Sequence, residues 1–314
     1  MPSSARRDNP LTLPNTIIGG VTKGGTTTLW SYFREHPQAL VAHRKEVHFF
    51  DYESHYARGL AHYARQFPAR AETEAARPLA IVDATPSYYA LPDVPRRIHQ
   101  ALPHVRLIFV FRNPLDRAYS NFWMGYANGR PGDSFDEAIR RPENRHFLAG
   151  SFYADAVERY LRLFPREQLL LLLTDELRSD PAGVRRRCYA HTGIDPDYVP
   201  GGQGSAREAQ NVARVPRNLA LQRLLYRWLA RKPEQEMVYD DKGRFLQRHD
   251  AAEGLLQHLG VQVHYHLTSL NTKPAQYPPM SREAAAWLLD LYRADIEHFG
   301  QLTGLDVSPW LRVR

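Results

Sequence analysis

The segment NTIIGGVTKGGTTTLW, residues 15–30, constrains the fold of this chain more than any other. A β-branched apolar run leads into the Gly-rich stretch TKGGTTT at 22–28, and an apolar, aromatic-bearing stretch follows. This order predicts a buried strand, a tight loop and the start of a helix. Free N–H groups and the positive dipole end at a helix start attract anions. The segment therefore predicts an α/β protein that holds a phosphate-like anion at this loop; a Gly-rich turn without a ligand is the alternative.

The position of Lys23 distinguishes this loop from that of nucleotide-hydrolysing enzymes. Their pattern is G-x-x-x-x-G-K-[ST], with lysine directly after the last glycine. Gly20 and Gly25 have that separation here, but Thr26 stands in place of the lysine and Lys23 precedes the double glycine. Its charge would lie beside the bridging side of a bound group and not along a triphosphate. A P-loop kinase is therefore the disfavoured alternative.

A second candidate anion site follows the apolar run LIFVF at 107–111. Such a continuous run is typical of a parallel strand covered on both faces. Arg112 follows at the carboxyl edge, where ligands of open α/β sheets bind, and Pro114 suits the first turn of a helix. Ser120 lies about two turns along that helix, so arginine and hydroxyl together could clamp a phosphate. The alternative is an ion pair between Arg112 and an acid such as Asp116.

Together these segments resemble the sulfotransferases that use 3′-phosphoadenosine 5′-phosphosulfate (PAPS), above all the carbohydrate-type heparan sulfate O-sulfotransferases. VTKGGTTTL resembles their 5′-phosphosulfate loop and FRNPLDRAYSNF their 3′-phosphate motif. KEVHFFD at 45–51 and VDATPSY at 82–88 are similar too, and order and spacing agree from about residue 15 to 182. The resemblance implies a P-loop-like fold, PAPS as co-substrate, 3′-phosphoadenosine 5′-phosphate (PAP) as product, and no metal.

The resemblance also assigns residues to the donor. Those expected to bind it are Lys23, Gly24, Gly25, Thr26, Thr27, Thr28, Arg112, Ser120, Tyr153 and Lys273. Lys23 is also expected to neutralise charge on the leaving oxygen. Lys273 is expected as a lid contact, with an ordinary surface lysine as the alternative.

For the acceptor side, Glu46 matches the family's catalytic glutamate and is the expected general base. His48 is the rival base because the pKa of histidine suits neutral pH; otherwise His48 and Asp51 orient the base or the acceptor. Asp83 is expected to contact the acceptor or to cap a helix. A short edge strand, with its two phenylalanines in the core, is the structural alternative for KEVHFFD. Ala84 departs from the animal heparan relatives, which carry a lysine there, and this weakens the expectation of a heparan-like acceptor.

Apolar runs near 16–21, 80–83, 107–111 and 169–173 alternate with helical stretches. This alternation predicts a central parallel sheet flanked by helices. We expect a flexible segment at 1–14 and a single domain at 15–314, in which residues 183–270 form a helical acceptor-side region. Helical periodicity at 151–164, 218–229, 251–259 and 284–302 and a loop or hairpin at 238–247 complete the layout.

The composition limits the classes of partner that we expect for this chain. The net charge of +7 comes from scattered arginines without a recognisable nucleic-acid module, so no nucleic-acid partner is expected. The single cysteine, Cys188, excludes an internal disulfide, and no apolar run approaches the ~20 residues of a membrane span. The start lacks the apolar core of a signal peptide, so a cytoplasmic location is expected.

The expected acceptor is a small molecule or glycan, with oxygen and nitrogen nucleophiles both open, and the oligomeric state is unassigned. A non-catalytic nucleotide-binding protein on the same fold is the third alternative.

Overall fold

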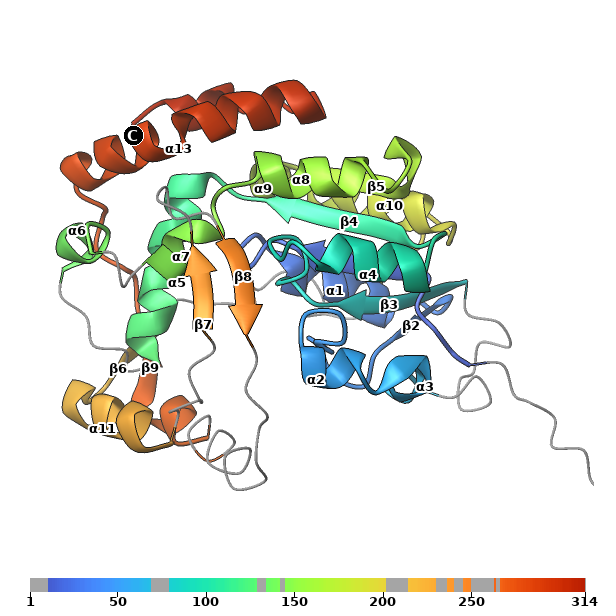
Figure 1. The fold of residues 1–314 in the computed structure, drawn as a ribbon, viewed down its shortest axis with the longest axis horizontal. Coiled ribbons are helices and arrows are strands. Elements are labelled where there is room, and N and C mark those ends of the chain that lie inside the picture. The colour runs from blue at the N-terminus through green and yellow to red at the C-terminus, as the bar shows by residue number, and fades with distance from the viewer. Residues whose placement is uncertain are drawn as a thin grey trace, which may run out of the picture.

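The central feature of the computed structural model is a sheet of five parallel strands in the order β2-β3-β1-β4-β5 (Figure 1). The structure describes residues 11–68, 79–128, 134–141, 145–201, 214–229, 236–239, 245–249, 263 and 266–313. The strands are β1 (Thr16–Gly20), β2 (Ala39–Val41), β3 (Ala80–Ala84), β4 (Arg106–Phe111) and β5 (Leu169–Leu173). The predicted parallel sheet is confirmed. The short edge strand β2 was not predicted, because three residues are too few to show a hydrophobic pattern.

Strand β1 lies in the middle of the sheet, between β3 and β4. The chain leaves β1 for β2 at the edge, returns to β3, and then crosses to β4 on the other side of β1. Ile17 of β1 is level with Asp83 of β3 and with Leu107 of β4. Such a reversal of strand order opens a crevice at the carboxyl ends of the strands, where ligands of open α/β sheets bind.

Helices cover both faces of the sheet. On one face, α1 (Thr26–Glu35) and α10 (Pro181–Thr192) pack Leu29, Phe33 and Tyr189 against β1 and β4. On the other face, α4 (Val94–Ala101), α8 (Ala154–Leu161) and α13 (Arg282–Thr303) contribute to a larger, aromatic-rich core. Helix α13 runs beside α8 in Figure 1. The helices predicted at 151–164 and 284–302 are thereby confirmed.

Smaller elements complete the described part of the chain. The remaining helices are α2 (Glu53–Tyr56), α3 (Gly59–Ala64), α5 (Pro114–Ala127), α6 (Phe135–Ala138), α7 (Arg145–Ala149), α9 (Thr174–Ser179) and α11 (Leu219–Leu229), with 3-10 turns η3 (Arg166–Gln168) and η4 (Ser308–Leu311). Two antiparallel pairs join β6 (Arg214–Pro216) to β9 (Thr272–Pro274) and β7 (Glu236–Tyr239) to β8 (Phe245–His249). The helix at 218–229 and the hairpin at 238–247 are confirmed, and the helix predicted at 251–259 lies outside the described residues. The region predicted as helical, 183–270, therefore also contains strands.

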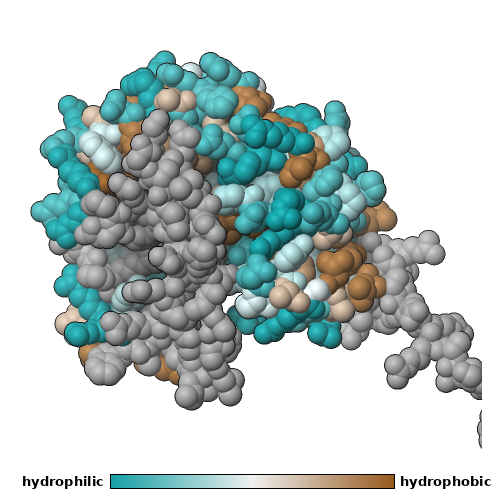
Figure 2. All heavy atoms as spheres, in the orientation of Figure 1, coloured by the Kyte–Doolittle hydropathy of each residue, from teal (hydrophilic) through white to brown (hydrophobic). Residues whose placement is uncertain are grey.

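The described surface is largely polar on the face shown in Figure 2. Hydrophilic side chains predominate over α13 and α8, and hydrophobic ones form small separate groups. Within the ranges that the structure describes, no helix combines the length and apolar character that a membrane span requires.

Candidate active site

The loops that leave the sheet strands meet at one edge. Because all five strands are parallel, their carboxyl ends lie on the same side. The guanidinium of Arg112, after β4, donates to the carbonyl of Lys23, after β1, at 3.4 Å. The hydroxyl of Thr174, after β5, donates to the carbonyl of Gly24 at 2.5 Å, and its oxygen lies 3.1 Å from that of Phe111. These contacts join three strand ends into one site.

The Gly-rich loop is tightly packed against β4. A Cβ on Gly24 would lie 2.2 Å from the carbonyl oxygen of Val110, so no larger residue fits without movement of the backbone. The N–H of Gly24 donates to the carbonyl of Val21 at 2.9 Å. This bond closes the loop, and the predicted contact of Gly24 with the donor stays a prediction. Gly25, at φ 117°, precedes α1 and supplies no side-chain cap, so the helix begins directly at the loop.

The remaining loop residues predicted to bind the donor differ in exposure. Thr26 is buried, whereas Thr27 and Thr28 at the start of α1 are partly exposed. Lys23 is partly exposed and has φ 72°. A left-handed backbone at a non-glycine residue is uncommon and concentrates at ligand-binding sites.

Cations gather around the loop, and within the described chain no ion pair joins Lys23 or Arg112 to an acid. Burial and the charges of Arg112 and Arg117 lower the pKa of Lys23. Burial also lowers the pKa of Arg112, and the charge of Asp116 opposes this only in part. The Nε of Arg112 is buried and has no hydrogen-bond partner. Within the described residues, neither Lys23 nor Arg112 forms an ion pair, so the expected alternative of an Arg112–Asp116 pair is not seen. Mutually repelling cations of this kind favour a bound anion.

The motif after β4 places Arg112 by a local helix start. The side chain of Asn113 accepts the N–H of Leu115 at 2.9 Å and caps α5, whose first residue is Pro114. The hydroxyl of Tyr153 donates to the carbonyl of Arg112 at 2.8 Å. Tyr153 is fully buried and supports Arg112 through this bond. Its contact with the donor stays a prediction. Ser120 lies further along α5 and is 7% exposed.

Arg117 is a structural residue that the sequence analysis missed. Its side chain is 2% exposed. It donates to the hydroxyl of Ser151 and to the carbonyl of Phe147, both at 2.6 Å, and so ties α5 to the segment before α8. The motif itself shows a second arginine five residues after Arg112. Its partners could not be found from the motif, because they come from a distant part of the sequence.

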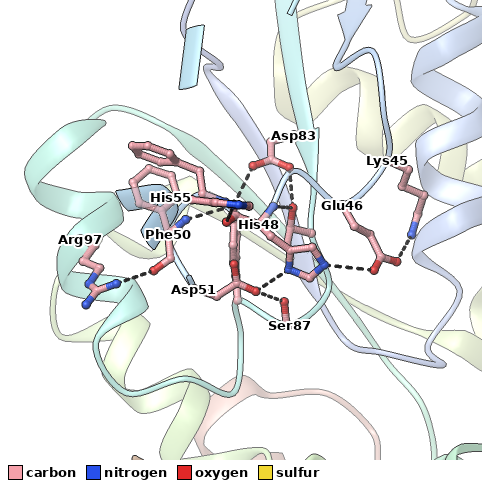
Figure 3. Close-up of polar contacts among 12 residues, drawn as sticks. Lys45, Glu46, His48, Phe50, Asp51, His55, Asp83, Ser87 and Arg97 are labelled. Carbon is pink, nitrogen blue, oxygen red and sulfur yellow. Dashed lines mark hydrogen bonds and ion pairs between the residues drawn. The ribbon is translucent and has the colours of Figure 1, made fainter. Parts of the chain in front are cut away.

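The KEVHFFD segment forms a loop and not the edge strand considered as its alternative (Figure 3). Glu46 has φ 66° and His48 has φ 55°, and the N–H of Glu46 donates to the carbonyl of Ala84 at 3.0 Å. Phe49 and Phe50 are buried, as expected.

A chain of charged side chains runs along this loop. The Nζ of Lys45 lies 2.8 Å from Oε1 of Glu46, and Nε2 of His48 lies 3.6 Å from Oε2 of the same carboxylate (Figure 3). Nδ1 of His48 lies 2.6 Å from Oδ2 of Asp51, which also accepts the hydroxyl of Ser87 at 2.5 Å. The imidazole is thus held between two carboxylates.

This arrangement sets the protonation of both base candidates. Burial alone would lower the pKa of His48, but the hydrogen bonds to Asp51 and Glu46 outweigh it and raise the pKa to about 10. For Glu46, burial is outweighed by the hydrogen bond from His48 and by Lys45, which together lower the pKa to about 2. At neutral pH His48 is therefore an imidazolium without a free lone pair, and Glu46 is ionised and able to accept a proton.

Two acidic residues expected on the acceptor side are enclosed. Asp83 has no exposed surface and accepts hydrogen bonds from Tyr63, Thr85 and Tyr88. Its carboxylate is thus occupied within the protein, and its contact with the acceptor stays a prediction. Asp83 caps no helix. The side chain of Asp51 has no exposed surface and acts on His48.

Lys273 lies on β9 and is exposed. Within the described chain no contact joins it to the Gly-rich loop, so its role as a lid stays a prediction. The segment that follows β9 does reach α5, where the hydroxyl of Tyr119 donates to the carbonyl of Pro278 and the rings of Trp123 and Tyr277 stack with centroids 5.1 Å apart. In the regions the structure describes, no three His, Cys, Asp or Glu side chains are grouped so as to hold a metal ion.

Comparison with known proteins agrees with this geometry. The family model described as "Sulfotransferase domain" matches residues 13–248. The chain belongs to the sulfotransferase family. This sulfotransferase is 34% identical over 189 residues to heparan sulfate glucosamine 3-O-sulfotransferase 3A1 of Mus musculus, with 58% of this chain and 46% of the relative covered. It is 35% identical over 187 residues to heparan sulfate glucosamine 3-O-sulfotransferase 6 of Homo sapiens, with 58% of this chain and 52% of the relative covered. The chain thus spans about half the length of these curated relatives.

A solved structure shares the fold over nearly its whole length. A sulfotransferase from Alicyclobacillus acidocaldarius superposes with a TM-score of 0.64 at 23% identity, covering 96% of this chain and 99% of that one. The central parallel sheet with flanking helices is therefore the sulfotransferase fold, as predicted.

Proposed function

We propose that this sulfotransferase moves the sulfo group of PAPS to a hydroxyl group of a carbohydrate, lipid or secondary-metabolite acceptor. The observation that carries the proposal is the pair Lys23 and Arg112, two cations that form no ion pair within the described chain, brought together at the ends of β1 and β4. PAPS carries anionic groups at its 5′ and 3′ ends, so one cation can serve each end. The close backbone approach at Gly24 and the start of α1 supply the rest of the cradle.

The same geometry argues against a P-loop kinase. A kinase of that type places a lysine after the last glycine to reach the outer phosphates of a triphosphate. Here Thr26 occupies that position and is buried. Lys23 instead follows β1 directly and contacts the Arg112 side of the site through its carbonyl.

The reaction that these residues support is a direct displacement at sulfur. The acceptor oxygen forms the new S–O bond, the bond from sulfur to the bridging oxygen breaks, and the leaving 5′-phosphate keeps that electron pair. Lys23 balances the charge that develops on the leaving oxygen, and Glu46 takes the proton of the acceptor hydroxyl. Catalysis then consists mainly of positioning and charge stabilisation.

We assign the base role to Glu46 rather than His48. The imidazolium of His48, whose pKa is raised to about 10, holds its protons at neutral pH. It serves to orient the carboxylate of Glu46. A base with a pKa as low as that of Glu46 gains strength when an acceptor displaces Lys45 from Oε1, because one stabilising charge is then removed.

The curated relatives are named for heparan sulfate glucosamine, which supports a glycan acceptor. Ala84 supplies no charge at the position where animal heparan relatives carry a lysine. Its side chain is 1% exposed and its carbonyl accepts the N–H of Glu46. Lys45, whose Nζ lies 2.8 Å from Oε1 of Glu46, is the lysine that could supply such a charge. We therefore propose a hydroxyl-bearing glycan without assigning heparan sulfate.

Donor binding is tested by calorimetry of the full chain with PAP and, separately, with ATP and magnesium. PAP is expected to bind, and both Lys23→Ala and Arg112→Ala are expected to weaken it at least about tenfold, since each removes a charge-assisted contact. Tight binding of magnesium ATP with no binding of PAP would favour the kinase.

Transfer is tested with PAPS and a panel of glycans that includes N-sulfated heparosan oligosaccharides, with mass spectrometry detecting the gain of one sulfo group. Glu46→Gln is expected to bind PAP normally and to transfer sulfate about 10²–10⁴-fold more slowly. Glu158→Gln, at an exposed glutamate paired with Arg162, is the matched control and keeps full activity. Full activity in Glu46→Gln together with its loss in His48→Ala would make the base assignment wrong.

A further inference from the structure

The loop that carries Glu46 and His48 is held by a buried polar cluster at the end of β3. We propose that Asp83, acting through the hydroxyls of Thr85 and Tyr88, is a positioning residue that fixes the backbone of this loop. The inference rests on the proposed function in one respect, namely that Glu46 is the base.

The carboxylate of Asp83 is enclosed and surrounded by hydroxyl donors. Its Oδ1 accepts the hydroxyl of Thr85 at 2.7 Å, and its Oδ2 accepts those of Tyr63 at 2.7 Å and Tyr88 at 3.1 Å. Asp83 forms no ion pair with any described cation. Burying a carboxylate is costly unless hydrogen bonds compensate. Three hydroxyl groups offset this cost, and each directs its proton at Asp83.

That direction determines what the hydroxyls offer to the loop. A hydroxyl has one proton, so once it donates to Asp83 its oxygen can face other groups only as an acceptor. The oxygen of Thr85 accepts the N–H of His48 at 3.4 Å. The oxygen of Tyr88 accepts the N–H of Phe49 at 2.9 Å and that of Phe50 at 3.4 Å. Consecutive backbone N–H groups of an irregular loop are thus satisfied by two oriented side chains.

The same stretch of chain holds the loop at two further points. The carbonyl of Ala84 accepts the N–H of Glu46. The hydroxyl of Ser87 donates to Asp51, the carboxylate partner of His48 (Figure 3). Both catalytic-loop residues with positive φ, Glu46 and His48, therefore have backbone N–H bonds to the end of β3. Left-handed backbone at such residues persists only where the surroundings impose it. The cluster of Asp83, Thr85 and Tyr88 supplies that constraint.

Tyr63 provides an internal comparison with Tyr88. Both side chains are fully buried, and both hydroxyls donate to the same oxygen of Asp83. Tyr63 comes from α3, and within the described residues its hydroxyl accepts no loop N–H. Its contacts with the loop are between rings: it stacks on Phe49 with centroids 4.3 Å apart and meets Phe50 edge-on at 5.2 Å, and a phenylalanine would keep both. Tyr63→Phe and Tyr88→Phe thus each remove one hydrogen bond to Oδ2 of Asp83. Only Tyr88→Phe also removes the oxygen that accepts the N–H groups of the loop.

The decisive experiment follows the titration of His48 by NMR in the full chain with labelled histidine, assigned with His48→Asn. In the wild-type protein the pKa of His48 is expected near the value of about 10 that its contacts with Glu46 and Asp51 produce. Those two carboxylates and Tyr52, on the same loop, are the titratable groups that face the ring. Tyr88→Phe is expected to lower the pKa of His48 by about one unit or more, since the ring loses its fixed position between the carboxylates. Tyr63→Phe is expected to leave it unchanged.

Kinetics supply the second readout. Tyr88→Phe and Asp83→Asn are expected to lower kcat about tenfold or more while the affinity for PAP stays at the wild-type value, because only the base is displaced. Asp83→Asn keeps the shape of the side chain but replaces one acceptor by a donor, which reverses the direction of a hydroxyl. Tyr63→Phe is expected to stay within about twofold of wild type in kcat.

Equal effects of the two tyrosine variants on the pKa of His48, or no effect of either, would refute the proposed positioning role of Asp83. If Asp83→Asn does not fold, the tyrosine pair still decides, because both of those variants retain Asp83. The two proposals can fail separately. If the wild-type protein transfers no sulfo group, the proposed function is refuted. If Tyr88→Phe still lowers the pKa of His48 and Tyr63→Phe does not, the positioning role of Asp83 holds.

Discussion

Replacement of Gly24 by alanine tests how closely the anion loop must approach β4. The added Cβ would lie 2.2 Å from the carbonyl oxygen of Val110 and 2.9 Å from a methyl of Val21. Relief of the first contact requires a backbone shift of about 1 Å, because a Cβ is fixed to its own main chain and the Val110 oxygen belongs to the main chain of β4. Overpacking of this kind typically costs about 1–3 kcal/mol of the free energy of unfolding. The loop must move away from β4, and Lys23 and the start of α1 move with it.

The measurements are urea unfolding and calorimetric binding of PAP to the full chain. Gly24→Ala is expected to lose about 1–3 kcal/mol of stability and to bind PAP at least about tenfold more weakly, which equals about 1.4 kcal/mol. Gly59→Ala is the matched control. Gly59 has φ 75° with open space around its would-be Cβ, so alanine there costs about 1–2 kcal/mol through backbone conformation alone. That variant is expected to bind PAP as the wild type does.

The comparison separates loss of stability from loss of the site. If Gly24→Ala bound PAP with unchanged affinity, the loop would tolerate the displacement, and the inference that its packing on β4 shapes the donor site would be refuted. If Gly59→Ala lost PAP affinity to the same extent, the effect would come from general destabilisation.

Two further predictions follow from single contacts. Tyr153→Phe removes the hydroxyl that donates to the carbonyl of Arg112, so PAP affinity should fall about fivefold for a contact worth about 1 kcal/mol; unchanged affinity in calorimetry would count against this support. The pKa of His48 in the folded protein, about 10, lies above the ordinary 6.5, so its ion pairs stabilise the fold fully below pH 6.5 and lose that effect as the pH rises through about 10. The difference in unfolding free energy between wild type and His48→Asn should therefore shrink between pH 7 and about 11, and a constant difference over that range contradicts the assigned charge.

The amino-acid sequence alone determined the architecture and the edge of the sheet where the chemistry lies. Continuous apolar runs identify the buried strands β1, β3, β4 and β5, since such strands are covered on both faces and need apolar residues throughout. Local chemistry also sufficed where it acts over a few residues: the Asn113–Pro114 pair starts α5, and the Gly-rich stretch forms the loop. Both depend on neighbours in the chain, which a sequence shows directly.

Tertiary structure decided which polar groups face the site and which support it. Asp83 and Tyr153 looked like ligand contacts but are enclosed, and the N–H of Gly24 turns into its own loop. Arg117 was not foreseen, nor was the bond from Thr174 to Gly24, which joins residues 150 positions apart. The side of a polar residue that meets solvent depends on elements packed against it from elsewhere in the chain. A local pattern can indicate that a carboxylate or hydroxyl is needed, but only the assembled sheet and helices determine which atom it bonds.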